Sequence, residues 1–462
     1  MITKLGFKNF KTWQEFGPVD FAPLTVLFGA NSSGKSSVAQ MLLMLKQTAE
    51  SSDRKLVFNT GGQKTAVDLG NFYEMVFEHE ESSRIDVDLT WNLPQELTLV
   101  DSYAQRDYSA DRIRFETSVG LFGKTSAPAV ERMKYTFGDI TKAGFSAGMT
   151  RTEKTAEPYD LTQQKYKFVR NRGRIWPITE PAKCYGFPDE VVNYYRNADV
   201  VKALGLSFEK LFQQVYYLGP LRERFLRQYT WTGEAPEHVG WRGEATVTAI
   251  LAGKDRTFNK GKGSTKKPLA ETVAFWLKQM GLIDSFEVKP LAPKRREYEV
   301  LVRSPGSRKP VNITDVGFGV SQFLPVLVQA LYAPPNSIIV IEQPEIHLHP
   351  AAQAWLADLF IEIIRGWGNG KKRNVQLIIE SHSEHFLRRL QRRIAEKAFS
   401  REEVAAYFFH PEIGGSKLES LDVDIFGNIR NWPDKFFGDT MEDAIAMTDA
   451  QMERMSKGER PQ

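Results

Sequence analysis

The sequence predicts an α/β protein with a mixed, largely parallel sheet at its core and an inserted α+β lobe. In residues 320–409, short apolar strands alternate with helices, the pattern of a parallel sheet with helices on its faces. Over residues 24–50, an apolar strand, a Gly/Ser loop and a helix follow one another, so the sheet is expected to use both ends of the chain. The residues in between do not continue this alternation, which indicates an insertion.

Length and composition bound the class of protein. The chain has 462 residues, too many for one simple core, which suggests two or three lobes. With 42% hydrophobic and 26% charged residues, the composition is ordinary for a globular protein. The formal net charge of +4 permits contact with nucleic acid but does not argue for it.

Cysteine usage and hydropathy bear on the compartment. The single cysteine, Cys184, excludes a disulfide framework within one chain and a thiolate zinc site, which fits a reducing cytosol. The first residues lack the apolar centre of a signal peptide, and prolines interrupt the most apolar stretch, 323–341. We therefore expect a cytoplasmic protein with no membrane partner.

The order of predicted elements divides the chain into four parts. Residues 1–79 are the N-terminal part of the core, 80–215 the inserted lobe of strands then helices, 216–410 the C-terminal part of the core, and 411–462 a tail or subdomain. Strands are expected within 1–30 and over 84–92, 112–118, 285–303, 337–341, 375–380 and 405–409. Helices are expected over 35–50, 188–214, 270–282, 320–332, 351–365 and 383–397, with a polar, basic loop at 252–267.

A phosphate-binding loop is the most specific motif. "GANSSGKSS" at 29–37 matches G-x-x-x-x-G-K-[ST], between an apolar strand and an amphipathic helix. Its two glycines let backbone amides point inward, the lysine reaches the β- and γ-phosphates, and the first serine after it ligates Mg²⁺. The predicted nucleotide contacts are Gly29, Asn31, Ser32, Ser33, Gly34, Lys35, Ser36 and Ser37.

An acidic residue ends the apolar strand before "IEQPEIHLHP". Glu342 stands where a carboxylate holds Mg²⁺, directly or through water, so Ser36 and Glu342 are the predicted metal ligands. Gln343 stands where a general base is expected; an amide cannot take a proton, but it can orient an attacking water. Glu345 is the nearest carboxylate able to take that proton.

Histidines near this strand admit two interpretations. A transition-metal site from Glu345, His347, His349 and His382 is not favoured, because the first two histidines alternate with apolar residues and no ligand pair has suitable spacing. His382 follows the strand 375–380, where a side chain can donate a hydrogen bond to a γ-phosphate. Four arginines on the next helix form either a solvated face or a contact for a partner or nucleic acid: Arg388, Arg389, Arg392 and Arg393.

A second glycine-containing helix start lies at "DVGFGVSQFLPVL". Gly317 and Gly319 leave backbone amides free at the N-terminus of a helix, with Ser321 in its first turn, an arrangement suited to an anion. If that anion is a γ-phosphate held by the phosphate loop of another subunit, two copies must pair.

These motifs together resemble the ABC-type ATPases of the SMC, RecF and OLD group, and most closely bacterial AAA-family ATPases with an uncharacterised C-terminal domain. The stretches that carry the resemblance are "NSSGKSS", "YYLGPLRERF", "PEHVGWRGE", "VGFGVSQFLPVLVQAL", "IEQPEIHLHPAAQ", "IIESHSEHFLRRLQRRI" and "FGNIRNWPDKFF". The resemblance implies an ABC-ATPase-like P-loop fold in which two ATP molecules lie between two subunits. Residues 29–37 match the Walker A loop, Glu342 the Walker B position, and residues 317–322 the signature region. His382 matches the switch histidine.

Three residues depart from the common pattern. Glu342 replaces an aspartate, Gln343 replaces the catalytic glutamate, and Gly317 stands where a serine is usual, so hydrolysis is expected to be slow. Relatives in anti-phage defence operons restrain or drive a nuclease, and this chain has no recognisable nuclease segment. The resemblance therefore implies an ATP-gated switch for a separate effector. The alternatives are a DNA-binding repair ATPase of RecF or SMC type and a scaffold that binds ATP without hydrolysing it.

Overall fold

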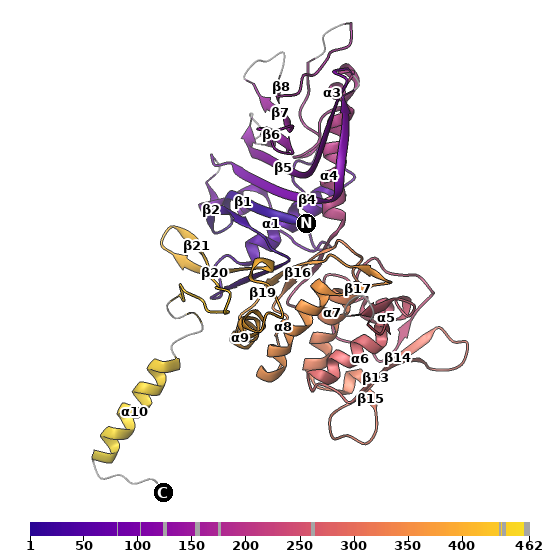
Figure 1. Cartoon of the computed structure of the whole chain (residues 1–462), viewed down its shortest axis with the longest axis vertical. Helices are drawn as coiled ribbons and strands as arrows, with labels where there is room; N and C mark the ends of the chain where they lie inside the picture. Colours follow the sequence, from indigo (N-terminus) through magenta and orange to yellow (C-terminus); the bar gives the residue numbers. More distant parts are fainter. Residues whose placement is uncertain are drawn as a thin grey trace.

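A central sheet joins two lobes in the computed structural model, and helix α10 (Thr440–Ser456) projects from one side (Figure 1). The purple upper lobe lies on one face of this sheet, and the orange helices lie on the other. The structure describes residues 1–80, 82–101, 103–122, 127–152, 158–173, 177–259, 264–433, 436 and 440–456.

The central sheet has six strands in the order β21-β20-β3-β19-β16-β9. All neighbouring strands are parallel except the edge pair β20–β21. The strands are β3 (Leu24–Gly29), β9 (Val215–Leu218), β16 (Ile338–Glu342), β19 (Gln376–Glu380), β20 (Val404–Glu412) and β21 (Gly415–Ser420). Strands from both chain ends are therefore neighbours, as the sequence predicts.

Alternation along these buried strands creates two cores, one on each face of the sheet. Leu27, Val340 and Ile378 face the core that also contains α1 (Ser36–Glu50) and the upper lobe. Val26, Ile339 and Ile379 face the second core. Helices from the C-terminal half pack there: α5 (Thr246–Ala252), α6 (Leu269–Gln279), α7 (Phe318–Tyr332), α8 (Pro350–Arg365) and α9 (Glu384–Ala395).

The upper lobe is an antiparallel sheet of seven strands in the order β2-β1-β4-β5-β6-β7-β8. Its strands are β1 (Ile2–Phe10), β2 (Trp13–Asp20), β4 (Ile85–Asp101), β5 (Arg106–Phe122), β6 (Ala127–Phe137), β7 (Phe145–Arg151) and β8 (Tyr159–Gln164). Helices α3 (Asp189–Tyr194) and α4 (Asp199–Gln213) complete the lobe, and Phe208 of α4 packs against Trp91 and Phe115.

Two small sheets and four short helices complete the described elements. One sheet contains β10 (Tyr229–Thr230), β13 (Ser285–Pro290), β14 (Glu297–Arg303) and β15 (Val311–Asn312); the other contains β11 (Thr257–Asn259), β12 (Lys267–Pro268), β17 (Trp367–Gly368) and β18 (Lys371–Lys372). The short helices are α2 (Phe72–Met75) and the 3₁₀ turns Phe77–His79, Ile313–Asp315 and Arg401–Glu403.

Element prediction is accurate in the core and coarse elsewhere. Helices α1, α6, α7, α8 and α9 and strands β16 and β19 lie within a few residues of their predicted ranges. The predicted loop at 252–267 instead contributes β11 and β12, and its residues 260–263 lie outside the described part. The division at 79/80 stays a prediction; strand pairing places β1 and β2 in the same sheet as the strands of the predicted insertion.

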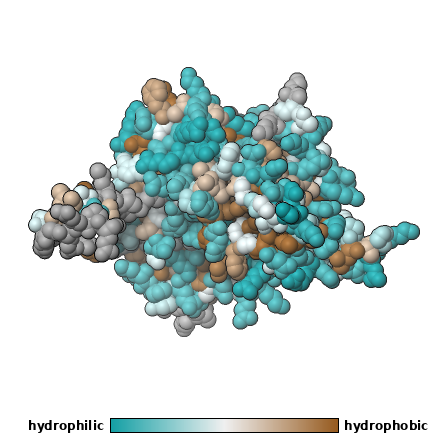
Figure 2. All heavy atoms as spheres, turned by 90° about the horizontal axis from the view of Figure 1, so that it is seen from below, coloured by the Kyte–Doolittle hydropathy of each residue, from teal (hydrophilic) through white to brown (hydrophobic). Residues whose placement is uncertain are grey.

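One face of the molecule is seen in Figure 2. Hydrophilic side chains cover most of the face in Figure 2, and hydrophobic residues gather near its middle. None of the helices in the described ranges combines the length and apolar character needed to traverse a bilayer.

Candidate nucleotide site

The phosphate loop leaves strand β3 and enters helix α1 with a backbone that only glycine tolerates at two positions. Gly29 has φ +144°, and a Cβ there would lie 2.2 Å from the Phe409 carbonyl oxygen. Gly34 has φ +84°, and a Cβ would lie 2.5 Å from Trp13 Nε1, which donates a hydrogen bond to the Gly34 carbonyl at 3.0 Å. These contacts fix the loop, so its shape is set before any ligand binds.

The start of α1 offers free donors. In the described part of the chain, the amides of Gly34, Lys35 and Ser36 donate no hydrogen bond to the protein. The positive end of the helix macrodipole lies at the same point. Free amides at a helix N-terminus that follows a glycine-rich turn form an anion site, and this is the predicted phosphate cradle. Asn31 and Ser32 are exposed at its rim, and Ser32 adopts φ +59°.

The Lys35 ammonium folds back into the loop. It is 3% exposed, and Nζ donates to the carbonyls of Gly29 at 3.2 Å and Ala30 at 2.5 Å and to Ser33 Oγ at 3.4 Å. Burial lowers the pKa of Lys35, while Glu380, Glu342 and Glu345 act to raise it. Its carbonyl partners are weak substitutes for an anion, so the ammonium is ready to exchange them for phosphate oxygens.

Two glutamates end the two neighbouring strands in register. Glu342 of β16 lies opposite Glu380 of β19, and Glu380 lies opposite Leu27 of β3. Ser36 Oγ donates to Glu380 Oε2 at 3.0 Å, and Lys35 Nζ lies 4.0 Å from Glu380 Oε1. The predicted pairing of Ser36 with Glu342 is therefore mediated by a third residue, Glu380, which was not predicted from the sequence.

Glu342 is buried among groups that disfavour its charge. Burial and the neighbouring Glu380 carboxylate raise the pKa of Glu342 to about 7, although the Tyr217 hydroxyl donates to its Oε1 at 2.9 Å. Burial also raises the pKa of Glu380. Two buried carboxylates with raised pKa values, beside a serine hydroxyl, form an oxygen-only set of ligands that a bound cation would stabilise.

The turn after β16 arranges the predicted water-activating residues. Gln343 adopts φ +46°, and its amide donates to the Glu380 carbonyl at 2.8 Å. Glu345 Oε1 accepts from the His382 amide at 2.5 Å, while its Oε2 is buried without a partner. Burial raises the pKa of Glu345. Burial is the main cause that lowers the pKa of His382, and the Lys35 charge lowers it further. The Nε2 atom of His382 is also buried without a partner. The structure thus brings Gln343, Glu345 and His382 together.

Arg222 holds this turn through its backbone carbonyls, a role that was not predicted from the sequence. Its guanidinium is 6% exposed, and Nη2 donates to the carbonyls of Glu342 at 2.8 Å and Gln343 at 3.3 Å. Burial lowers the pKa of Arg222 to about 10, against the attraction of Glu345. Arg222 and Tyr217 both lie in "YYLGPLRERF", so the motif was visible in the sequence, but its spacing alone assigns no role.

The second glycine-containing helix start does not contact the phosphate loop of the same chain. Gly317 precedes α7, a Cβ added to it would meet nothing within 4 Å, and Phe318 is 59% exposed. Ser321 Oγ donates to the Phe318 carbonyl at 2.9 Å. No hydrogen bond or ion pair joins residues 315–322 to residues 29–37, all of which the structure describes.

The other candidate residues have local partners. His349 caps α8, since its Nδ1 accepts from the Ala351 amide at 3.3 Å, and His347 lies beside the Phe318 ring. In the described ranges, no three His, Cys, Asp or Glu side chains are grouped to hold a metal ion. The four arginines of α9 are all paired with Glu384, Asp358 or Glu396, so a solvated, internally neutralised face describes them better than a free basic patch.

Comparison with protein families adds independent support. Residues 1–174 match the family model "AAA ATPase domain", and residues 256–388 match "AAA domain, putative AbiEii toxin, Type IV TA system". The two matches together contain the phosphate loop, Glu342 and His382. The chain carries an AAA-type ATPase domain. Residues 400–446 match a third model, "Protein of unknown function (DUF3696)". No curated protein matches the sequence significantly.

Solved structures similar to this chain include SMC head domains. "Crystal structure of the SmcHead bound to the C-winged helix domain of ScpA" is 12% identical, with coverage of 91% of this chain and 98% of that chain and a TM-score of 0.43. The "SMC head domain from Thermotoga maritima" is 12% identical, with coverage of 91% and 99% and a TM-score of 0.39. The head domain of Pyrococcus furiosus Smc bound to the C-terminal domain of ScpA is 10% identical, with coverage of 98% and 99% and a TM-score of 0.43. Because these TM-scores are low, the fold and site assignments rest on the strand order and side-chain geometry above.

Proposed function

We propose that this protein binds ATP with Mg²⁺ at the phosphate loop, hydrolyses it slowly, and pairs with a second copy around the nucleotide. The observation that carries the proposal is the convergence at one sheet edge of free helix-end amides, a buried lysine and three buried carboxylates. The AAA family match agrees with nucleotide chemistry at this edge.

Phosphate binding follows from the loop geometry. The β- and γ-phosphates accept hydrogen bonds from the amides of Gly34, Lys35 and Ser36, and the Lys35 ammonium leaves the Gly29 and Ala30 carbonyls to contact them. The preformed glycine backbone means that little ordering accompanies binding.

The oxygen ligands fit Mg²⁺ better than a transition metal. Ser36 Oγ, Glu380 and Glu342 would hold it directly or through water, and the remaining positions suit water and phosphate oxygens. Bound there, Mg²⁺ neutralises charge on the phosphates and favours ionised Glu342 and Glu380. Glu345 is not one of these proposed ligands, so it is left for proton transfer.

Slow hydrolysis follows from the turn after β16. Gln343 orients the attacking water, and Glu345 accepts its proton, helped by burial, which raises the pKa of this carboxyl. His382, neutral because burial lowers its pKa, donates to the γ-phosphate. A base displaced by two residues from the usual position is less well aligned with the water, so turnover is expected to be low.

Pairing completes the site. Gly317, Phe318 and Ser321 lie at a helix N-terminus on the chain surface, where no hydrogen bond or ion pair joins residues 315–322 to residues 29–37, all of them described. In the pair, this segment of one copy supplies backbone amides to the γ-phosphate bound by the other. ATP therefore sets the closed state, and hydrolysis limits its lifetime.

The closed pair serves as a switch for a separate effector, most simply a nuclease in anti-phage defence. The resemblance to defence ATPases and the description of the 256–388 model as a toxin of a toxin–antitoxin system both support a partner-linked role. Pairing of the α9 arginines with acidic neighbours weighs against direct DNA binding through that helix.

Turnover and oligomer size test the proposal together. We would measure phosphate release and mass with ATP and Mg²⁺ for the wild type, Lys35→Ala and Gln343→Glu. Slow release that Lys35→Ala abolishes and Gln343→Glu accelerates, with a doubling of mass on ATP, supports a slow ATP-closed pair. Doubling without phosphate release above the Lys35→Ala background contradicts hydrolysis and identifies an ATP-binding clamp. Salt-sensitive duplex binding strengthened by ATP favours the DNA-binding alternative.

A further inference from the structure

A basic segment of the upper lobe, residues 165–172, lies between strand β8 and helix α3 and reads KYKFVRNR. Tyr166 and Phe168 are buried while the lysines beside them are exposed, which is the alternation of an extended chain. Two exposed arginines follow with the same spacing of two residues. Together with one arginine from the turn before α4, the exposed cations of this surface are Lys165, Lys167, Arg170, Arg172 and Arg196.

Hydrogen bonds hold the backbone of the basic segment in place. The Asn197 side chain donates to the Lys167 carbonyl at 2.9 Å and accepts from the Val169 amide at 3.0 Å. The Val169 carbonyl accepts in turn from the Arg196 amide at 2.8 Å. The backbone is therefore fixed while the cationic side chains extend into solvent, so little backbone ordering accompanies the binding of a ligand.

The charges of this surface are not compensated by the chain itself. None of the five cations forms an ion pair in the part of the chain that the structure describes. By contrast, Arg84, Arg114 and Lys134 of the same lobe each lie 2.7–2.8 Å from a carboxylate oxygen. The first acid of α4, Asp199, pairs with Lys202 at 3.2 Å. Uncompensated positive charge gathered on one surface attracts a polyanion.

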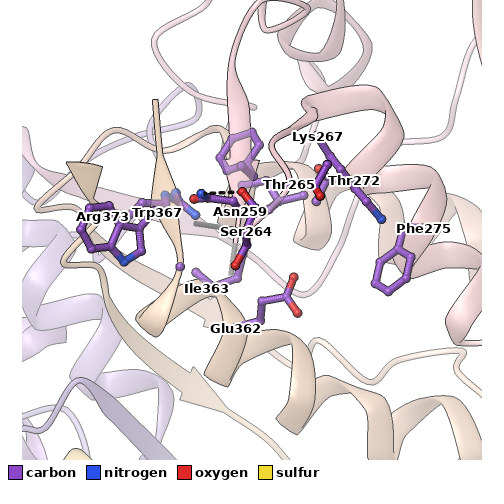
Figure 3. Close-up of a pocket in the computed structure, with 13 residues that line it drawn as sticks. Asn259, Ser264, Thr265, Lys267, Thr272, Phe275, Glu362, Ile363, Trp367 and Arg373 are labelled. Carbon is purple, nitrogen blue, oxygen red and sulfur yellow. Dashed lines mark hydrogen bonds between the residues drawn. The ribbon is translucent and has the colours of Figure 1, made fainter. Parts of the chain in front are cut away.

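The cavity in Figure 3 shows the opposite arrangement of cations. It measures about 200 Å³ and lies between α6, α8 and the small sheet of β11, β12, β17 and β18. Arg373 donates to the carbonyls of Ala330 at 2.9 Å and Ala333 at 2.8 Å. Lys267 Nζ lies 4.4 Å from the centre of the Phe275 ring. Both cations are engaged by the chain, so they do not mark a site for an anion.

An exposed aromatic side chain is joined to the basic segment. Tyr103, in the turn between β4 and β5, is 59% exposed. Its amide donates to Asp101 Oδ1 at 3.1 Å, and this buried carboxylate also accepts from Asn197 Nδ2 at 3.2 and 3.3 Å. Because Asn197 holds the Lys167 carbonyl as well, a buried and paired network ties the turn of the tyrosine to the row of cations.

The chemistry of this surface fits a single strand of nucleic acid better than a duplex or an acidic protein. Cations two residues apart on an extended chain are about 6.6 Å apart, so each can meet a different phosphate of one strand. An exposed tyrosine ring offers a face on which an unpaired base stacks, whereas the bases of a duplex are already stacked on one another. An acidic protein would use the charges but would have no need of the ring.

We propose that the upper lobe binds single-stranded nucleic acid at this surface. Phosphates of one strand contact the five cations, and a base stacks on Tyr103. The binding does not require ATP, so it stands apart from the proposed ATPase activity. It also differs in place from the arginines of α9, which are paired with acidic neighbours.

Fluorescence anisotropy of a labelled oligothymidylate of about 12 nucleotides tests binding to the nucleotide-free full chain. We expect saturable binding whose logarithmic affinity falls linearly with the logarithm of the salt concentration, with a slope of about 0.7 for each phosphate contact. The double variant Lys167→Gln, Arg170→Gln should weaken binding at least tenfold at about 50 mM salt and reduce this slope by about 1.4. Tyr103→Leu should weaken binding about fivefold or more and leave the slope unchanged, because stacking releases no counterions.

The matched control is the double variant Arg308→Gln, Lys309→Gln, which removes the same charge from an exposed turn without an aromatic residue. All these substitutions replace exposed side chains, so the variants should melt with the wild type. Absence of saturable binding, equal weakening by the two double variants, or tighter binding of a duplex of the same length would overturn the proposal. Unchanged affinity in Tyr103→Leu would mean that the surface recognises charge alone, as for an acidic protein partner, and would overturn the assignment to nucleic acid.

Discussion

The phosphate loop and the segment before α7 are both glycine-containing turns that open a helix, yet the chain treats them oppositely. Gly34 is enclosed by Trp13, Ser416 and Thr12, so that a Cβ would lie 2.5–2.6 Å from each. Gly317 has open space around it, and the next residue, Phe318, is 59% exposed. In the phosphate loop, the same chain packs around the turn and fixes its shape before a ligand binds. The turn before α7 stays exposed, so it can contact another surface. This difference fits the proposed pairing, in which one nucleotide site is built from two chains.

Mixing two inactive variants gives the strongest test of whether the phosphate loop of one copy and the segment before α7 of another form one site. Lys35→Ala removes the phosphate contact, and Gly317→Arg adds bulk where the free chain has room, so each should fold and each should lose about 100-fold or more of turnover. In an equal mixture, half of the pairs contain one copy of each, and one of the two sites in such a pair has both segments intact. We therefore expect about a quarter of wild-type phosphate release to return.

The control for this experiment is a mixture of Lys35→Ala with a double variant that carries both changes. In that mixture every phosphate loop is defective, so activity must stay at background. Turnover that stays absent in the first mixture, or full turnover by Gly317→Arg alone, would show that the exposed segment does not complete the site.

Glu345→Gln should separate ATP-driven pairing of two copies from the hydrolysis step at the phosphate-loop side of the site. The amide keeps the acceptor for the His382 amide but cannot take a proton, so we expect turnover to fall about 100-fold while ATP still doubles the mass. Phosphate release and light scattering on the same samples measure both quantities. The neighbouring half-exposed acid Glu384, which pairs with Arg388, is changed to Gln as the control. Unchanged turnover in Glu345→Gln would exclude this carboxylate as the base.

The parallel core was predictable from the sequence because each of its strands is short, apolar and bounded by residues that end strands. Val340 and Ile378 face one core and their chain neighbours the other, so periodicity could not assign faces, but length and flanking Gly, Pro and Ser defined the elements. The upper lobe was less predictable. Pairing of β1 with β4 joins residues about eighty positions apart, and such long-range register is fixed by tertiary packing that local sequence patterns do not reveal.

Within the site, residues on a contiguous motif were predictable and supporting residues were not. The phosphate loop, Glu342, Glu345 and His382 converge as expected. Glu380 could have been found, since "VIE" and "IIE" end two apolar strands in the same way, and equal strand ends predict adjacent carboxylates. Arg222 could not, because its role depends on reaching the Glu342 and Gln343 carbonyls across 120 residues of chain.

Arg222→Lys should loosen the phosphate-loop side of the site and leave the segment before α7 unchanged. Both bonds come from one guanidinium nitrogen, Nη2, and a lysine would replace it with a compact, strongly hydrated ammonium that is costly to bury here, so the Glu342–Gln343 peptide should lose its fixed position. We expect kcat to fall about tenfold with the KM for ATP within twofold, because phosphate contacts are intact. Arg308→Lys, at an exposed position outside the proposed site, is the control. A raised KM at constant kcat would assign Arg222 to nucleotide binding instead of positioning.

The smallest effect concerns stability in the absence of nucleotide. Glu342 has its pKa raised to about 7 by burial and by Glu380, from an ordinary value of 4.5. Below pH 4.5 the carboxyl is protonated in both the folded and unfolded states and costs nothing. As pH rises from 4.5 to 7, the unfolded chain ionises first, so the folded state progressively loses about 2–4 kcal/mol relative to it, and above pH 7 the loss is complete.

Glu342→Gln keeps the acceptor for the Tyr217 hydroxyl and removes this penalty. The nucleotide-free variant should therefore melt several degrees above the wild type at pH 8 and at nearly the same temperature at pH 4.5. Differential scanning fluorimetry across this range measures the difference, with Glu223→Gln, at an exposed position, as the control. Mg²⁺ with ATP should narrow the gap at pH 8, because a bound cation stabilises the ionised carboxylate only in the wild type. If the variant and the wild type melt at the same temperature at every pH, ionised Glu342 does not destabilise the folded state. The phosphate-loop side of the site would then need no cation to stabilise this carboxylate.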